Sequence, residues 1–315
     1  MMPGKKKRMF DPTDFIKNAR HKSAPSPMDQ QTAKMDESLY FIHMIKNGAT
    51  VATGEHEALT RIFTGQKMYV DTRDISLAPH LMLDGVWEEP FTKIFRRYLK
   101  PDTVFFDVGA NFGYFGLVAG ADVTHEGSIH FFEPNPLLAN YIKKTASING
   151  LWNRSKVNQK AVGARKARLT LTVPGGYFGS ASMVIDAQDI ANYVDKSELV
   201  SFKVDQIALD DYVKENKLKR VDVMKIDVEG YEESVYAGMG QVIKQNPNLT
   251  VFLEFTAGSY KAPKVFFQQI KKDFRNIYLC EDTLTPVSTI ADLGEVIKRD
   301  GFAMIAFSKN DLLSL

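Results

Sequence analysis

The chain has 315 residues, with 40 Lys and Arg against 38 Asp and Glu, so its net charge is only +2. This length can bury one large core or two small ones. The near-neutral charge provides no broad basic surface for nucleic acid, and the single cysteine, Cys280, excludes an intrachain disulfide and a thiolate metal cluster. Because no apolar run approaches the roughly 18 residues of a membrane span, we expect a cytoplasmic protein.

The first hundred residues differ in character from the rest. Residues 1–35 are polar and predict a flexible tail, in which the basic run from Lys5 to Arg8 is either a solvated segment or a weak docking site for an anionic membrane. Residues 36–100 predict an extension packed on the main domain. Its expected elements are helices at 39–45, 55–63 and 89–99 and a strand at 67–70.

Residues 101–310 form the predicted main domain, in which strands and helices alternate. Such alternation is typical of a mostly parallel sheet covered by helices, and we expect an antiparallel strand at its C-terminal end. The expected strands lie at 103–106, 128–132, 156–162, 221–226, 250–255, 276–280 and 302–307. The expected helices lie at 113–119, 137–148, 230–244, 262–272 and 290–298. Between 165 and 207 alternating apolar residues predict an antiparallel insertion, with a mobile loop at 175–180.

The most informative segment is 105–113, where a buried strand runs into Asp107 and a glycine turn. Gly109 and Gly113 let the backbone bend and approach a ligand, and the next helix offers free N–H groups. About twenty residues later a second strand ends in Glu133, the place of a ribose-binding acid in nucleoside sites. Asn111 occupies the first glycine position of the dinucleotide fingerprint, and Asp107 would repel a pyrophosphate. The pattern therefore favours a cationic nucleoside, S-adenosylmethionine, over a nicotinamide.

Acids follow four of the predicted parallel strands, and ligands of open α/β sheets bind outside the carboxyl ends of the strands. These acids are Asp107, Glu133, Asp227 and Glu254. The alternative for each is that it caps the following helix. We expect Glu133 to bind the ribose hydroxyls and Asp107 to face the amino or sulfonium end. The other expected cofactor contacts are Gly109, Ala110, Asn111 and Gly113 under the methionine moiety, and Pro134, Asn135 and Gln159 near the adenine.

Methyl transfer to a hydroxyl needs a group that accepts the hydroxyl proton. The candidate bases are Asp227 and Glu229, and Glu254 could assist them. Asp227 and Glu254 together would also offer two oxygen ligands to Mg²⁺, which leaves a metal-assisted reaction as an alternative. Lys225 lies inside a strand and is expected to pair, and His130 is expected to be a core residue rather than a base.

Four segments together resemble the FkbM-type S-adenosylmethionine-dependent methyltransferases. They are FFDVGANFGYFG (105–116), FFEPNP (131–136), VDVMKIDVEGYE (221–232) and VFLEF (251–255), with a weaker match at LDGVWEEP (83–90). The resemblance implies a Rossmann-like class I methyltransferase fold and O-methylation of a hydroxyl on a sugar, glycan-like or polyketide acceptor. Glu88 matches the glutamate of the family's G-x-[aromatic]-E segment and is expected near the cofactor. The alternatives are RNA ribose methylation, a nicotinamide-dependent oxidoreductase and a protein that binds without turnover.

Overall fold

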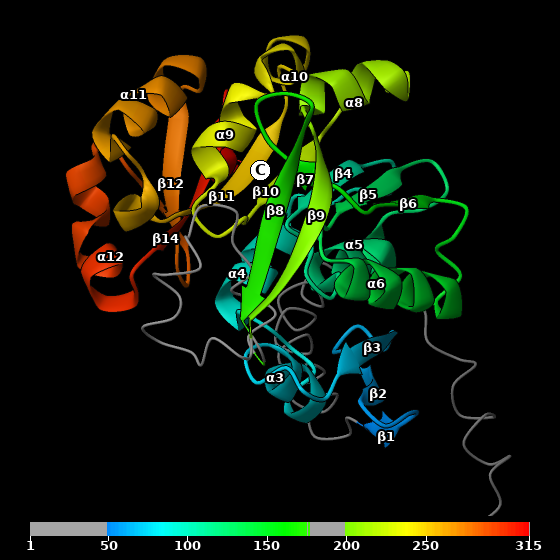
Figure 1. Ribbon diagram of the computed structural model, residues 1–315. Coiled ribbons are helices and arrows are strands. Elements are labelled where there is room, and N and C mark those ends of the chain that lie inside the picture. Colours follow the sequence, from blue (N-terminus) through cyan, green and yellow to red (C-terminus); the bar gives the residue numbers. More distant parts are fainter. Residues whose placement is uncertain (1–48, 175, 177–198, 315) are drawn as a thin grey trace, which may run out of the picture. The chain divides into compact units, whose positions relative to one another are not determined.

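The computed structural model describes residues 49–174, 176 and 199–314, which belong to one compact unit (Figure 1). The predicted tail, the helix at 39–45 and nearly all of the loop at 175–180 lie outside these residues. Within the described ranges, no helix is long and apolar enough to cross a membrane.

An eight-stranded sheet organises the unit, in the order β13-β12-β14-β11-β10-β4-β5-β6. The strands β11, β10, β4, β5 and β6 are parallel, whereas β14 joins β11 antiparallel. The bounds are β4 Val104–Val108, β5 Ser128–Phe132, β6 Ser155–Asn158, β10 Val223–Ile226, β11 Thr250–Phe255, β12 Asn276–Cys280, β13 Leu284–Pro286 and β14 Ala303–Ser308. The prediction of a Rossmann-like, mostly parallel sheet with a C-terminal antiparallel strand is confirmed.

Strand β4 is apolar on both of its faces, because each face packs against a different layer of the protein. Phe105 lies 5.0 Å, ring to ring, from Phe95 on one side of the sheet, and Phe106 lies 5.7 Å from Tyr212 on the other. Helices cover both faces, so consecutive residues of the strand are buried in different layers. The helices are α4 Glu89–Arg96, α5 Tyr114–Asp122, α6 Pro136–Ile148, α8 Leu209–Glu215, α9 Glu232–Ala237, α10 Gly240–Gln245, α11 Pro263–Asp273 and α12 Gly294–Asp300, with short 3₁₀ turns at 257–259, 290–293 and 312–314.

Three predictions of local structure were wrong. The segment 55–63 is not a helix, because β2 (Glu57–Arg61) pairs antiparallel with β3 (Lys67–Asp71) and buries alternate residues; β1 (Val51–Ala52) completes this small sheet. The predicted strand 156–162 divides between two sheets, since β7 (Ala161–Val162) leaves the main one. The predicted helix 230–244 breaks at Gly238, where a Cβ would lie 2.2 Å from the carbonyl oxygen of Gly163.

The insertion is confirmed as an antiparallel pair of strands, β8 (Ala167–Pro174) and β9 (Leu199–Ile207). The short strand β7 pairs with the other edge of β9. The elements that were not predicted include the helices α3 (Ala78–Leu83) and α8 and the short strands β1 and β13. At the start of α3, the N–H groups of Leu77 and Ala78 donate to Asp74. His130 is a core residue as expected: it is buried, its Nδ1 bonds the hydroxyl of Tyr212 at 2.7 Å, and burial lowers its pKa to about 4. Cys280 is also buried, and burial raises the pKa of its thiol.

Candidate functional site

A cavity of about 310 Å³ lies at the carboxyl ends of the central strands. Residues 76–77, 87–88, 160–162 and 171 wall it from outside the sheet, together with Phe302 before β14. The predicted site residues that line it are Glu88, Gly109, Ala110, Asn111, Glu133, Pro134, Asp227, Glu229 and Glu254. The strand-end acids of β5, β10 and β11 thus meet in one cavity, as parallel strands require.

Glu133 is a buried carboxylate held by two backbone groups. The N–H of Asn111 donates to its Oε2 and the N–H of Asn135 to its Oε1, each at 2.8 Å. A carboxylate has about four acceptor positions, so this arrangement leaves room for two further donors from a ligand. Burial raises the pKa of Glu133 to about 8, against the effect of the two N–H groups. A ligand that donates two hydrogen bonds would favour the charged form.

Asp107 is fully buried, but it lies outside the cavity lining. Its Oδ2 accepts from the N–H of Gly116 at 2.8 Å, which makes it a partner of the first turn of α5. The capping alternative therefore applies to this acid. Burial raises its pKa to about 7, although Lys225 opposes this shift. Asp107 can act on a ligand through its field rather than by direct contact.

The glycine turn after β4 packs closely against the strand end that follows β10. A Cβ on Gly109, at φ +79°, would lie 1.7 Å from the carbonyl oxygen of Asp227. The N–H groups of Gly109 and Ala110 both donate to the carbonyl of Phe132 at 3.0 Å, and that of Gly113 to Ala110 at 2.7 Å. These donors are consumed within the fold. The missing side chain of Gly109 thus makes room for the neighbouring strand end, and because Gly109 also lines the cavity, its close approach to a ligand stays a prediction.

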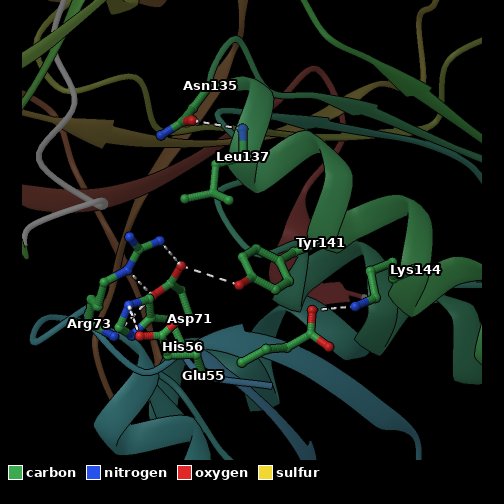
Figure 2. Close-up of polar contacts among 9 residues, drawn as sticks. Glu55, His56, Asp71, Arg73, Asn135, Leu137, Tyr141 and Lys144 are labelled. Atoms are coloured by element: carbon green, nitrogen blue, oxygen red, sulfur yellow. Dashed lines mark hydrogen bonds and ion pairs between the residues drawn. The ribbon is translucent and has the colours of Figure 1, made fainter. Parts of the chain in front are cut away.

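Three other predicted contacts also lie outside the lining. Gly113 precedes α5 at φ +85°, and a Cβ there would press on Ile142. Asn135 caps α6 by accepting from the N–H of Leu137 at 3.0 Å (Figure 2), and so positions Glu133. Gln159 is exposed, and the cavity is reached by its neighbour Lys160 instead. The chain turns out of the sheet at this point, which a strand prediction over 156–162 could not show.

Lys225 is the buried cation of the site. Its Nζ donates to Asp227 Oδ2 at 2.7 Å and lies 4.7 Å from the ring centroid of Phe115. Burial would lower its pKa, but the carboxylates of Asp227, Glu88 and Asp107 outweigh this effect and the net pKa is raised. The ammonium therefore stays charged, and it fixes one oxygen of Asp227.

Glu88 lies beside this pair with an unusual backbone. Its φ of +44° is left-handed, and its Oε2 is buried without a hydrogen-bond partner in the described part of the chain. Burial raises its pKa to about 7; Lys225 lowers it and Asp227 raises it. The Oδ1 of Asn111 is a second buried atom of the cavity without a described partner. Both atoms fit a site that a polar ligand completes.

The loop that carries Glu229 is held by Glu232, three residues further along the chain. Glu232 is completely buried, accepts from the N–H groups of Val228 (2.9 Å) and Gly230 (3.2 Å), and receives the hydroxyl of Tyr260 at 3.0 Å. These bonds fix the loop in which Glu229 adopts φ +53°. Such backbone strain costs about 1–3 kcal/mol and persists only where surrounding bonds enforce it.

Glu229 and Glu254 both have raised pKa values, and the charge of Glu229 contributes to the shift of Glu254. Burial is the main reason that the pKa of each is raised, and the charge of Asp227 adds to it for both. Glu254 also receives the Thr256 hydroxyl at 3.2 Å. The pKa of each is raised above neutrality, so both carboxyls hold a proton at pH 7, and a nearby cation would favour the charged forms that can accept one.

The suggested Mg²⁺ site does not fit these residues. Among the residues that the structure describes, no group of three or more His, Cys, Asp or Glu side chains is placed to hold a metal ion. One oxygen of Asp227 is already bound to the Lys225 ammonium. We therefore derive no step through a metal.

A polar network anchors the N-terminal strands to α6, and with them the segment that walls the cavity (Figure 2). Asp71 is buried, binds Arg73 through two oxygens and receives the hydroxyl of Tyr141 at 3.2 Å. Lys144 pairs with Glu57 on β2. Residues 76–77, only a few positions past Arg73, line the cavity.

Sequence reasoning did not find the remaining lining residues. Apolar and aromatic side chains from six separate segments complete the walls, and their residue types are those of any core. They include Leu77, Trp87, Tyr114, Phe115, Val162, Leu171 and Phe302. Lys225 is different, because a lysine within an otherwise apolar strand is itself a signal.

Comparison with known proteins gives a family match. The sequence model described as the methyltransferase FkbM domain matches residues 107–279. A relative from Streptomyces tacrolimicus, 31-O-demethyl-FK506 methyltransferase FkbM, is 31% identical over 172 residues, which are 45% of this chain. The match spans 61% of that relative's own length.

Solved structures show weak similarity at low identity. An O-methyltransferase from Bacillus cereus in complex with SAH has a TM-score of 0.41 and 11% identity, with 73% of this chain and 84% of that chain covered. An S-adenosylmethionine-dependent O-methyltransferase from Thermotoga maritima has a TM-score of 0.41, 13% identity and coverage of 84% and 86%. A tRNA m1G37 methyltransferase from M. jannaschii has a TM-score of 0.41, 10% identity and coverage of 82% and 55%.

Proposed function

The chain belongs to the FkbM methyltransferase family, and we propose that it transfers a methyl group from S-adenosylmethionine to a hydroxyl of a sugar, glycan-like or polyketide acceptor. The observation that carries this proposal is the placement of Glu133, held by two backbone N–H groups, in the same cavity as the carboxyls of Glu229 and Glu254. Glu133 is suited to bind a ribose, and the carboxyls of Glu229 and Glu254 are suited to remove a hydroxyl proton. The name of the Streptomyces relative, 31-O-demethyl-FK506 methyltransferase, supports transfer of the methyl group to an oxygen.

Donor binding uses the β4–β5 side of the cavity in this proposal. Glu133 accepts hydrogen bonds from the ribose hydroxyls with the oxygen positions that its backbone partners leave open. Pro134 borders the base, and the backbone of Ala110 and Asn111 supports the methionine moiety. Asp107 acts from below the turn, where its negative charge favours a cationic ligand.

The donor, when bound, supplies an electrophilic methyl group on a positively charged sulfur. The chain's own residues then have to orient the acceptor hydroxyl in line with that methyl and accept its proton. Glu254, at the end of β11, and Glu229, on the loop after β10, are the proposed proton acceptors. Asp227 orients them through its fixed charge, because its Oδ2 is held by Lys225.

The charge of the cavity favours this function over the two alternatives. Six acidic residues lie in or directly beside the lining: Glu88, Asp107, Glu133, Asp227, Glu229 and Glu254. Against these, the described lining contains two lysines, Lys160 and Lys225. The described lining therefore offers few cations to a pyrophosphate or to the phosphates that flank an RNA ribose.

A labelled-donor assay tests the proposal. The purified full-length chain is incubated with S-adenosyl[methyl-³H]methionine and extracts of its native cell, and the labelled product is identified. We expect a base-stable label on a neutral hydroxylated compound, lost in Glu254→Gln and retained in Glu89→Gln, an exposed acid on α4. Label that appears only in RNA, or a chain that binds NADH and not S-adenosylmethionine, would overturn the proposal.

A further inference from the structure

A buried tyrosine lies next to the segments that carry the two proposed proton acceptors. Tyr260 follows the 3₁₀ turn at 257–259 and lies outside the cavity lining. The centroid of its ring lies 5.1 Å from that of Phe255 and 5.2 Å from that of Phe266 on α11. Burial raises the pKa of its hydroxyl, so the group keeps its proton and can both donate and accept a hydrogen bond.

The hydroxyl of Tyr260 fixes the end of β11. It accepts from the backbone N–H of Thr256 at 3.0 Å and lies 3.1 Å from the carbonyl oxygen of Glu254. The side-chain hydroxyl of Thr256 in turn donates to Oε1 of Glu254 at 3.2 Å. Tyr260 therefore helps to set the position of Thr256, and Thr256 orients the carboxyl of Glu254.

The same hydroxyl also reaches the loop after β10. It donates to Oε2 of Glu232 at 3.0 Å, and Oε1 of that carboxyl receives the backbone N–H groups on both sides of Glu229. The two loops are in close contact as well, because a Cβ on Gly230 would lie 2.6 Å from the Cβ of Ser259. The loop that carries Glu229 is thus joined to Tyr260 through a single carboxyl group.

The spacing of the two proton acceptors depends on contacts beyond the sheet. The last registered pair of β10 and β11 is Ile226 with Leu253, and both Glu229 and Glu254 follow this pair. The bonds of Tyr260 join the two segments past that point. Methyl transfer is sensitive to such spacing, since a misplacement of about 1 Å can lower the rate about 100-fold.

We propose that Tyr260 is a positioning residue for the transfer, whose hydroxyl holds the carboxyls of Glu229 and Glu254 at the spacing that the acceptor hydroxyl requires. The inference rests on the proposed function. In that function the acceptor oxygen forms the new C–O bond, the C–S bond breaks with its electron pair left on sulfur, and the hydroxyl proton passes to one of the two carboxyls in its charged form. Because Tyr260 lies outside the cavity lining, loss of its hydroxyl should slow the transfer and leave donor binding unchanged.

Steady-state kinetics of Tyr260→Phe in the full-length chain test this role. S-adenosyl[methyl-³H]methionine is varied at a saturating amount of the native-extract fraction that the labelled-donor assay shows to contain the acceptor. We expect kcat to fall at least about tenfold. The KM for the donor and the calorimetric Kd of S-adenosylhomocysteine should both stay within about twofold of wild type.

Tyr236→Phe is the matched control for the loss of a buried hydroxyl. Tyr236 is a second buried tyrosine beside Phe266, with ring centroids 5.5 Å apart, and its hydroxyl donates to Asp273 at 2.9 Å, outside the cavity lining. This variant should shift the urea midpoint about as much as Tyr260→Phe and leave kcat within about twofold of wild type. Equal kcat values in the two variants would overturn the inference.

Thr256→Val provides an independent test if Tyr260→Phe does not fold. It removes the hydroxyl that orients Glu254 and keeps the backbone N–H that donates to Tyr260. We expect kcat to fall at least about threefold at an unchanged donor KM, and an unchanged kcat would refute the positioning role. If the wild type transfers no methyl group, the proposed function itself fails and this inference with it, whereas an active wild type with variants that match the control refutes the inference alone.

Discussion

Replacement of Lys225 by methionine is the most informative perturbation of the site. The substitution keeps an unbranched apolar stem and removes the ammonium that faces Asp227, Glu88 and Asp107. Deleting one partner of a buried ion pair costs about 3–5 kcal/mol, because the remaining charge stays buried without compensation. For a folded unit of this size, 1 kcal/mol shifts the Tm by about 2–4 °C, so we expect a loss of at least about 6 °C.

The pH dependence of this loss distinguishes electrostatics from packing. Lys225 lowers the pKa values of Glu88 and Asp107, each of which is still raised to about 7 by burial. Without the lysine both pKa values rise further, so the two acids become neutral as the pH falls and their charge no longer needs a partner. The destabilisation should therefore be larger at pH 8 than at pH 5.5.

Urea unfolding at the two pH values measures the effect, with Lys93→Met as the matched control. Lys93 makes a pair of similar length, 2.6 Å to Glu89, on a half-exposed helix surface, and its loss should cost no more than about 0.5 kcal/mol. If Lys225→Met costs no more than this control, or costs more at pH 5.5 than at pH 8, the description of Lys225 as the neutralising cation is refuted.

Three further predictions concern the scaffold and its protonation. Gly109→Ala should lower the free energy of unfolding in urea by at least about 3 kcal/mol, because its Cβ would lie 1.7 Å from the carbonyl oxygen of Asp227. The control Gly301→Ala has a similar φ of +86° but open space around the Cβ, and it should lower that free energy by only about 1 kcal/mol. Glu232→Ala should cost about 3 kcal/mol, since it leaves two loop N–H groups without their partner; an unchanged urea midpoint would contradict this. Because the pKa of Glu133 is raised to about 8 in the fold, the folded state holds a proton that the unfolded state has lost above about pH 4.5, so stability should decline as the pH rises from 5.5 to 8.5. Saturating S-adenosylmethionine or Glu133→Gln should flatten that decline, and a slope of opposite sign would refute the assignment.

The sequence predicts the central sheet well because its signal is local and strong. The strands Ser128–Phe132 and Thr250–Phe255 have the predicted bounds, since each is a mostly apolar run with an acid next to its carboxyl end, Glu133 or Glu254. Strand β2 was harder than its partner β3, which was predicted at 67–70, because alternation over five residues with one buried face resembles one side of a helix. The predicted strand 156–162 is divided because its last residues, β7, pair with β9, which lies some forty residues further along the chain.

The site could be predicted where topology alone decides it. Three of the four strand-end acids line the cavity, since parallel strands bring their carboxyl ends to one edge. Asp107 does not, because its side chain turns towards the first turn of α5. The role of Lys225 follows from register: it stands directly beside Asp107 on the neighbouring strand and two residues before Asp227. The pairing of two distant strands fixes that register, and one sequence does not reveal it.

The two sequence motifs of the site are halves of one physical unit. The backbone N–H of Asp227 donates to the carbonyl of Val108 at 3.0 Å, and the carbonyl of Asp227 occupies the space that a side chain on Gly109 would need. The glycine turn after β4 therefore sets the position of the acid after β10. Asp227 is bonded to Lys225, and Lys225 faces Glu88. A substitution in the glycine turn should therefore shift the side chains at the β10–β11 end of the cavity, although the turn itself need not contact a ligand. This coupling explains why the glycine turn and the K-I-D-V-E-G segment are informative together, although each alone occurs in many folds.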